Sequence, residues 1–291
     1  MRARLYQTGK TLQLDGKPQE IIAVMRNLRQ DAATKQKPVP DKMGLDDTGL
    51  RPALLDWEKV RGVCRDKRAE SIFKVGQLVA TPHKQLGWQG GCIIWRVCAV
   101  TASAVTLVVT RPVAFDFEFD EGELTTDNTE KCNTRGREYG YNSWRESALR
   151  QWLNSSGAAG KWWGMQNSWD VAPGYAHNVP GFLAGFDAAF LECVKDHNTI
   201  TALWDKPGVA EKTKDKFYLL SRTEVFGDTN NDVAEGEKLD LPQQFLRGHY
   251  WWLRSPNPGN ANNVYSVYTA GTLYVNHASY AFAVAPACVI G

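Results

Sequence analysis

The chain has 291 residues, a length that fits one large domain or one domain with a small attachment. Hydrophobic residues make up 43% of it, so the chain can bury a substantial core, and wholesale disorder is excluded. The formal net charge of +2 gives no global attraction to nucleic acid or to an anionic membrane, and we expect neither as a partner. The first residues lack an apolar signal segment and no apolar run reaches membrane-spanning length, so we expect neither export by the standard route nor membrane insertion.

The first part of the chain, residues 1–70, is predicted to be a small amino-terminal arm for attachment or oligomerisation. Residues 1–50 are polar and are interrupted by breakers such as the proline-rich segment 35–40. Apolar residues at helical spacing predict one helix within residues 20–30. A stronger helical pattern follows Pro52 and continues to about residue 69.

Strand patterns dominate the next part of the chain. Alternation of apolar with other side chains predicts a strand at 73–80. Runs rich in β-branched residues predict two more strands at 92–100 and 105–110. Residues 116–121 alternate aromatic and acidic side chains, which fits either an edge strand whose outer face repels pairing or a solvated loop.

Two amphipathic helices are predicted after these strands, at 143–154 and 187–194. The first begins at Ser143 with Glu146 three residues later, which is the arrangement of a capping box. We expect five large residues of this helix and of a later strand in the core, namely Trp144, Leu149, Trp152, Trp251 and Trp252.

A strand at 216–221 leads into a short helix at 222–226, and the last strands are predicted at 250–254 and 283–290. The order of strands, then helices, then strands predicts an α+β fold with an antiparallel sheet and two flanking helices, rather than alternating βαβ units.

Motifs of nucleotide binding, metalloprotease or serine-hydrolase chemistry and paired CxxC spacings do not occur in the sequence, so we expect no catalytic residues and no cofactor. The segment Asp228–Asp232 begins like a calcium loop, but Val233 and Leu239 stand where such a loop needs Gly and Glu. We therefore expect a solvated turn and no metal site. The six cysteines are expected to be free thiols, although Cys92 and Cys98 flank an apolar run and could pair.

The most informative feature is that residues 255–291 contain no Asp, Glu, Lys or Arg. At the chain average of 23% charged residues, such a run would arise by chance only about once in ten thousand. The stretch is rich in Asn, Tyr, Ser and Thr, which would each need a partner if they were buried. Neutral hydrogen-bonding and aromatic side chains are typical of antibody paratopes, so the stretch favours an exposed recognition surface over catalysis.

Five segments, taken in order, resemble a large bacterial and phage domain family of formally unknown function that is related to the C-type lectin fold. The most specific are Trp-Trp-Leu-Arg-Ser at 251–255 and Ser-x-Leu-Arg-x-Trp-Leu-Asn at 147–154. The others are 73–76, 94–97 and 217–221. The resemblance covers about residues 72–291 and implies a C-type-lectin-like ligand-binding domain over residues 71–291.

Many phage members of that family are similar to the variable proteins of diversity-generating retroelements, in which adenine-directed mutagenesis rewrites Asn codons. The resemblance implies a variable region at about 257–288, closed by a fixed strand at 284–286, where this chain has Val-Ala-Pro and many relatives have Arg before the proline. The ligand-binding positions implied by analogy are Ser266, Tyr268, Thr272, Tyr274, Val275, Asn276, His277, Ser279, Tyr280 and Phe282.

The leading hypothesis is a phage tail protein, made in the bacterial cytoplasm and carried in the virion, that binds a bacterial surface protein or glycan. Its arm would attach to other tail proteins, and association with further copies of the chain stays open. One alternative is a bacterial surface or wall-associated lectin-like protein of fixed specificity. Another is a formylglycine-generating-type enzyme, whose copper-binding cysteine pair the lone Cys288 does not supply.

Overall fold

The computed structural model describes residues 52–85, 91–122, 139–167, 170–242 and 247–291, together with the backbone of two strands near the amino terminus. The chain divides into two compact units, Met1–Met43 and Gly44–Gly291. The first contains an antiparallel hairpin of β1 (Arg2–Gln7) and β2 (Lys10–Asp15). The helix expected within residues 20–30 lies outside the described residues.

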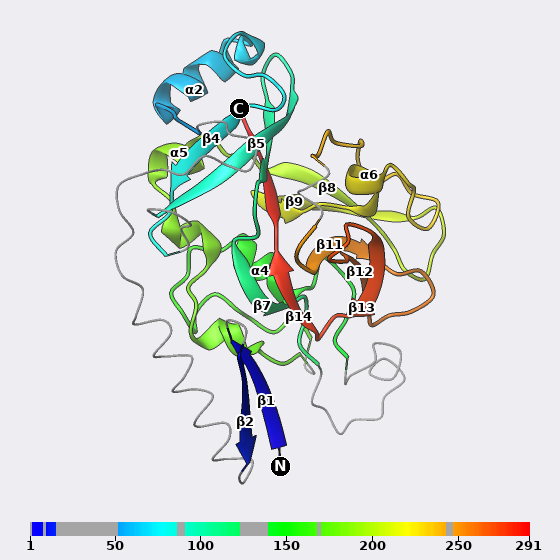
Figure 1. Ribbon diagram of the computed structural model, residues 1–291. Coiled ribbons are helices and arrows are strands. Elements are labelled where there is room, and N and C mark those ends of the chain that lie inside the picture. The colour runs from blue at the N-terminus through cyan, green and yellow to red at the C-terminus, as the bar shows by residue number, and fades with distance from the viewer. Residues whose placement is uncertain are drawn as a thin grey trace. The chain divides into compact units, whose positions relative to one another are not determined.

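The second unit is an α+β structure dominated by sheets (Figure 1). One sheet has six strands in the order β10-β15-β6-β5-β4-β3, antiparallel except for the β3–β4 pair. Its strands are β3 (Ala53–Leu54), β4 (Leu78–Pro82), β5 (Cys92–Val100), β6 (Val105–Val109), β10 (Phe217–Leu219) and β15 (Pro286–Ile290). The strand expected at 73–80 begins only at Leu78, because Gly76 has a left-handed φ of +92° that breaks the extended backbone.

The second sheet has five strands in the order β13-β12-β11-β14-β7. They are β7 (Ala114–Glu118), β11 (Trp251–Pro256), β12 (Asn263–Val267), β13 (Leu273–His277) and β14 (Ala281–Val284), and only β11 and β14 pair in parallel. β7 lies at the edge of this sheet, which confirms the edge-strand interpretation of the aromatic and acidic alternation. A separate hairpin of β8 (His197–Ala202) and β9 (Ala210–Asp215) was not expected.

The helices are short. Within the described ranges they are α2 (Trp57–Arg65), α4 (Ala148–Leu153), α5 (Ala188–Cys193) and α6 (Arg222–Phe226), with 3-10 turns at Ala69–Ser71, Gly174–His177 and Phe182–Gly185. α2 packs on α5, and the ring centroids of Trp57 and Phe190 are 4.7 Å apart. Because α2 lies in the unit that starts at Gly44, the expected arm boundary near residue 70 falls inside that unit.

The start of α4 differs from the expectation. Ser147, not Ser143, is the N-cap, and its hydroxyl accepts a hydrogen bond from the backbone N–H of Arg150. Glu146 instead accepts a hydrogen bond from Asn167 at 3.0 Å. A complete capping box occurs at α6, between Ser221 and Glu224.

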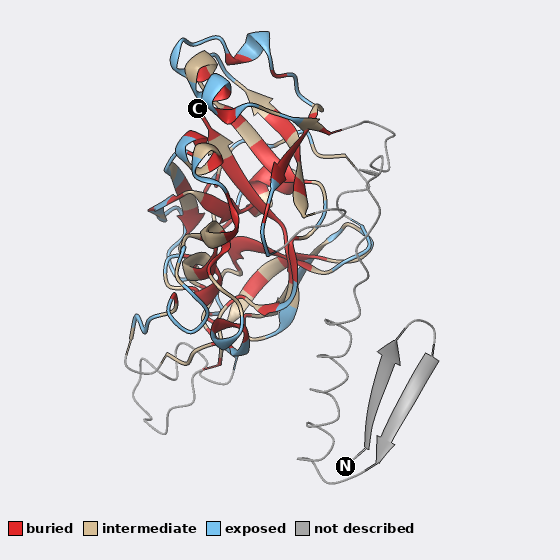
Figure 2. Ribbon diagram, turned by 90° about the vertical axis from the view of Figure 1, so that its left-hand side faces the viewer, coloured by how far each residue is buried: buried red, intermediate tan, exposed pale blue. Residues whose placement is uncertain are grey.

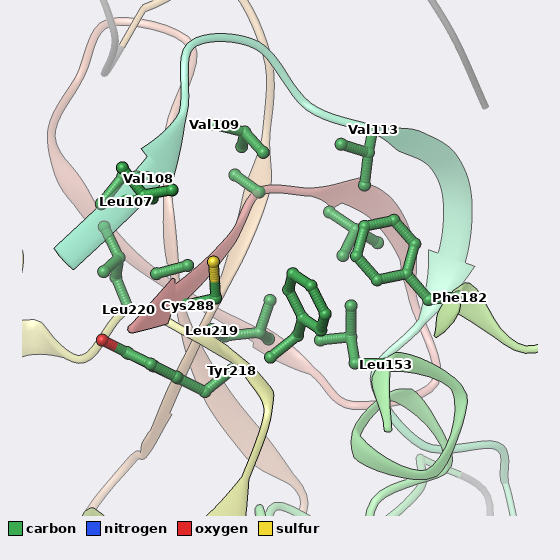
Figure 3. Packing of buried hydrophobic residues seen from close by; sticks show 14 of the residues in the cluster. Leu107, Val108, Val109, Val113, Leu153, Phe182, Tyr218, Leu219, Leu220 and Cys288 are labelled. Atoms are coloured by element: carbon green, nitrogen blue, oxygen red, sulfur yellow. The ribbon is translucent and has the colours of Figure 1, made fainter. Parts of the chain in front are cut away.

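Buried residues lie in the strands of both sheets (Figure 2). Around β15, the core brings together side chains of β6, β10, α4 and the loop before α5, among them Leu107, Leu153, Phe182, Leu219 and Cys288 (Figure 3). The expected core residues are confirmed, since none of them is more than 2% exposed: Trp144, Leu149, Trp152, Trp251 and Trp252.

The cysteines among the described residues, Cys64, Cys92, Cys98, Cys193 and Cys288, are free thiols, so the open pairing of Cys92 with Cys98 is not made. No helix in the described ranges is both long and apolar enough to cross a membrane.

Candidate ligand-binding surface

The charge-free stretch contains the end of β11, the strands β12, β13 and β14, and the last strand β15. β12 and β13 form a hairpin in which Ser266 faces Tyr274 and Val264 faces Asn276. Its turn is closed by hydrogen bonds between Tyr268 and Thr272 and from Gly271 to Tyr268, with Gly271 at a φ of +85°. β13 is an edge strand of the sheet, and among its residues Tyr274 is exposed while the other four are partly buried.

The turn between β13 and β14 is anchored by its one buried residue, Ala278. The Ala278 carbonyl accepts hydrogen bonds from the backbone N–H groups of Phe119 and Asp120, at 2.9 and 3.1 Å. A further bond from the Tyr280 N–H to the His277 carbonyl closes the turn. The turn thus holds Tyr280 at the surface, where 48% of it is exposed.

Aromatic rings from these strands and two neighbouring segments touch one another in a continuous series, which we call the aromatic band. The centroid distances along it are 4.2 Å for Tyr139–His277, 5.2 Å for His277–Tyr280, 6.4 Å for Tyr280–Phe282, 5.0 Å for Phe282–Tyr250, 4.7 Å for Tyr250–Tyr268 and 5.8 Å for Tyr268–Tyr274. Aromatic pairs at such separations stabilise one another beyond the area that they bury.

The band is exposed at its two end rings and at Tyr280, and it is anchored at Phe282. Tyr274 and Tyr280 are about half exposed, and Tyr139 is 41% exposed. In the middle, the ring of Phe282 lies 4.6 Å from that of Trp252, which is fully buried. The exposed rings are therefore presented by a rigid support, which lowers the entropy cost of ordering them on binding.

The structure brings most of the expected binding residues together on this part of the sheet. Tyr268, Tyr274, His277 and Tyr280 all belong to the aromatic band. Of the ten expected positions, Thr272, Tyr274 and Tyr280 are exposed, while Tyr268, Val275, Asn276, His277, Ser279 and Phe282 are partly buried.

Ser266 departs from the expectation. It is fully buried, and its hydroxyl accepts a hydrogen bond from Asn276 Nδ2 at 2.9 Å, so it supports Asn276 rather than facing solvent. Two members of the band, Tyr139 and Tyr250, were missed because they lie before the charge-free stretch. The tyrosine immediately before Trp-Trp-Leu-Arg-Ser was the available sequence signal for Tyr250.

Beneath this sheet, Arg254 of the Trp-Trp-Leu-Arg-Ser segment is buried in a polar cluster. Its guanidinium donates to Glu224 Oε2 at 2.6 Å, to the Leu219 carbonyl at 2.8 Å and to the Ile200 carbonyl at 3.1 Å. It also bonds the carbonyl of Glu235, whose side chain accepts from Ser255. Arg254 therefore ties β8, the end of β10, α6 and the segment around Glu235 to β11.

The charged groups of this cluster shift one another's pKa values. Burial alone would lower the pKa of Arg254, but the Glu224 and Glu235 carboxylates outweigh it and raise the pKa above the ordinary value. Burial raises the pKa of the Glu235 carboxyl, and Arg254 opposes that rise. The cluster is completely covered, so we assign it to support of the surface rather than to contact with a ligand.

The Asp228–Asp232 turn lies beside this cluster. Asn230 is buried and donates to the Pro256 carbonyl at 3.0 Å, while Asp228 pairs with Arg222 at 3.4 Å. Within the described part of the chain, no group of three or more His, Cys, Asp or Glu residues is placed to hold a metal ion.

Glu118, at the end of β7, gives the sheet a pH-dependent stability. Burial, followed by the neighbouring carboxylates of Glu121 and Asp116, raises the pKa of Glu118 to about 7 from an ordinary value of 4.5. A raised carboxyl pKa means that the folded state holds its proton more tightly than the unfolded state does. The contribution of Glu118 to the free energy of unfolding therefore falls as pH rises from about 4.5 to about 7. Above that range the ionised, buried carboxylate destabilises the folded state to its full extent.

We expect Glu118→Gln to melt at a higher temperature than the natural protein at pH 8, with the difference shrinking toward pH 5. Melting curves at several pH values measure this effect. Glu237→Gln, at an exposed position, is the matched control and should leave the pH dependence unchanged. An identical pH dependence in natural protein and Glu118→Gln would show that this carboxyl is not desolvated.

Taken together, fold and site define an α+β protein that presents a tyrosine-rich surface on a mostly antiparallel sheet, largely from a stretch without charged residues. Residues 105–291, more than half of the chain, match the family model described as "Domain of unknown function (DUF6273)", and the chain belongs to that family. No curated protein and no solved structure matches the chain.

Proposed function

We propose that this protein is a binding protein and not an enzyme, and that the aromatic band with its neighbours on β13 contacts a bacterial surface protein or glycan. The observation that carries the proposal is the partly exposed aromatic band, which packs on the buried Trp252, in a chain without charged side chains from residue 255 onward. Tyr supplies contact area at little entropy cost, and Asn and Ser supply adaptable hydrogen bonds. Catalysis, in contrast, needs titratable groups, of which this stretch has His277, the tyrosines and the buried Cys288.

We further propose that the domain is C-type-lectin-like and that its surface is diversified by a retroelement, as in a phage tail protein carried in the virion. The amino-terminal unit would then attach to other tail proteins. The difference in exposure between the strands supports this proposal, because Tyr274 on β13 and Tyr280 in the following turn are exposed while the Trp-Trp-Leu-Arg-Ser segment is buried. Sequencing the neighbouring DNA tests it: we expect a near-copy of the stretch that encodes residues 262–288, differing at adenines, beside a reverse-transcriptase gene.

The binding surface itself is tested by a small library at Tyr268, Tyr274, Asn276, His277 and Tyr280. Exposed positions away from caps and cores shift stability by only about 0.5 kcal/mol, whereas aromatic anchors of an interface contribute about 2 kcal/mol or more each. We therefore expect variants that keep their melting temperature but lose or switch binding to whole bacterial cells.

The most informative variant of that library is the double substitution Tyr274→Ala/Tyr280→Ala. We expect it to lower the affinity for cells by more than ~30-fold. Met165→Ala, at a position 63% exposed and outside the aromatic band, is the control and should bind unchanged. Full cell binding by the folded double variant would contradict the proposal. Unfolding of most library members would assign the stretch to the scaffold instead.

A further inference from the structure

A concave site that shares no residue with the aromatic band lies between segment 141–146 and the turn of the β8–β9 hairpin. The hollow has a volume of about 240 Å³, and Glu211 and Pro256 complete its wall. Drug-sized ligands occupy pockets of about 300–1,000 Å³, so this one suits a single small ring.

Hydrogen bonds fix the walls of this pocket. The backbone N–H of Gly259 donates to the Trp204 carbonyl at 2.9 Å, and Asn231 Nδ2 donates to the Leu203 carbonyl at 2.7 Å. The indole N–H of Trp204 donates to the Tyr141 hydroxyl at 3.4 Å. The partly exposed Trp204 is thus held with an aromatic surface beside the hollow.

A buried hydrogen-bond acceptor on the pocket wall points to a ligand. The side chain of Asn142 is fully buried, and its Nδ2 donates to the carbonyls of Asn260 and Asn263 at 2.6 and 3.0 Å. These two bonds identify the other atom as the oxygen, and Asn142 Oδ1 has no partner among the residues that the structure describes. A buried acceptor without a partner is costly, and because Asn142 belongs to the pocket lining, a ligand hydroxyl that reached Oδ1 would remove this cost.

The charges around the pocket are largely balanced. Glu211 pairs with Arg145 at 2.6 Å, and the exposed Asp205 is followed by Lys206. Glu146 accepts a hydrogen bond from Asn167 Nδ2 at 3.0 Å. Such a wall offers many hydrogen-bond acceptors with little net field, which favours a neutral donor of hydroxyl groups over a cation.

We propose that this pocket binds a single sugar ring without a metal ion. The carboxylates of Glu146 and Glu211 and the amide oxygen of Asn142 accept from the sugar hydroxyls, and the apolar face of the ring lies against Trp204. The proposal is independent of the aromatic band, so either site can fail its test while the other stands.

The test uses the full chain labelled with ¹⁵N and titrated with glucose, galactose and N-acetylglucosamine. The indole resonance of Trp204 is assigned by its loss in Trp204→Phe. We expect at least one of the sugars to shift that resonance in a saturable way, with a Kd on the order of millimolar. Glu146→Gln should weaken binding about tenfold or more, and the exposed Glu192→Gln, on α5, should leave it unchanged.

Saturation-transfer measurements on Trp204→Ala give a second readout, with loss of the sugar signal expected in protein that keeps its melting temperature. Should Trp204→Ala fail to fold, the Glu146→Gln titration decides alone. Absence of any shift at sugar concentrations on the order of 100 mM would overturn the proposal. So would a Trp204 shift produced by ethanolamine and not by the sugars, because it would assign the pocket to a cation.

Discussion

Replacing Arg254 by methionine should lower the free energy of unfolding by about 3–5 kcal/mol, because it leaves buried Glu224 without its partner. The three backbone carbonyls that the guanidinium serves would also lose a donor. Chemical denaturation followed by far-ultraviolet circular dichroism measures the change. The loss is large because removal of one member of a buried charge pair exposes the cost of burying the other.

Arg68→Met is the matched control for this substitution. Arg68 pairs with Asp66 at 3.2 Å, but both side chains are about half exposed or more, and such pairs contribute about 1 kcal/mol or less. A loss below about 1 kcal/mol for Arg254→Met would show that the polar cluster does not hold the sheet. The double variant Arg254→Met/Glu224→Leu should recover part of the stability, but not all of it, since Glu224 also closes the capping box of α6.

Truncation of Trp152 to alanine should cost about 3–5 kcal/mol, since it opens a large cavity in a tightly packed cluster. The indole is fully buried, its ring lies 4.7 Å from Phe117 and 5.2 Å from Phe182, and its N–H donates to the Pro180 carbonyl at 3.0 Å. The same denaturation experiment measures the loss. Trp152→Phe should be milder, because it keeps most of the ring and removes only the hydrogen bond and part of the volume.

Tyr274→Ala is the surface comparison for Trp152→Ala. Tyr274 is 52% exposed on an edge strand, and its truncation should change the free energy of unfolding by about 0.5 kcal/mol or less. Similar losses for Trp152→Ala and Tyr274→Ala would reverse our assignment of core and surface.

The elements that could be predicted from the sequence are those whose pattern is set by their own residues. β5 and β6 are runs of β-branched residues, and α5 and α6 lie where their apolar spacing or caps predict them. The hairpin of β8 and β9 was missed because β9 has the sequence AEKTKD, with polar side chains on both faces. Its buried Asp215 is satisfied by Arg150 and Trp144, which lie in and just before α4, and no local pattern encodes that pairing.

For the candidate surface, too, the sequence predicted what local composition determines and missed what depends on contacts between distant segments. Lack of charge together with many polar and aromatic side chains predicted a surface in this stretch, and three of the ten expected positions are exposed while six are partly buried. The position of each residue on the sheet decided the rest. Ser266 is covered because its hydroxyl holds Asn276, and Tyr139 joins the surface only because the chain returns to stack on His277. Both facts depend on contacts between segments that are distant in sequence.

Because of the order of strands in the two sheets, the core can form only if the chain is translated in the correct reading frame beyond the candidate surface. β14 belongs to the five-stranded sheet, and after Ala285 the chain enters the six-stranded sheet as β15, between β10 and β6. A stop codon in residues 255–285 would therefore remove, and a frameshift would remove or replace, an interior strand that carries the fully buried Cys288 and Ile290. Such products could not complete the core and would be left to proteases. If the codons of the surface residues are repeatedly mutated, only chains translated in the correct frame as far as β15 would fold. Products of frameshifts and stop codons would be degraded.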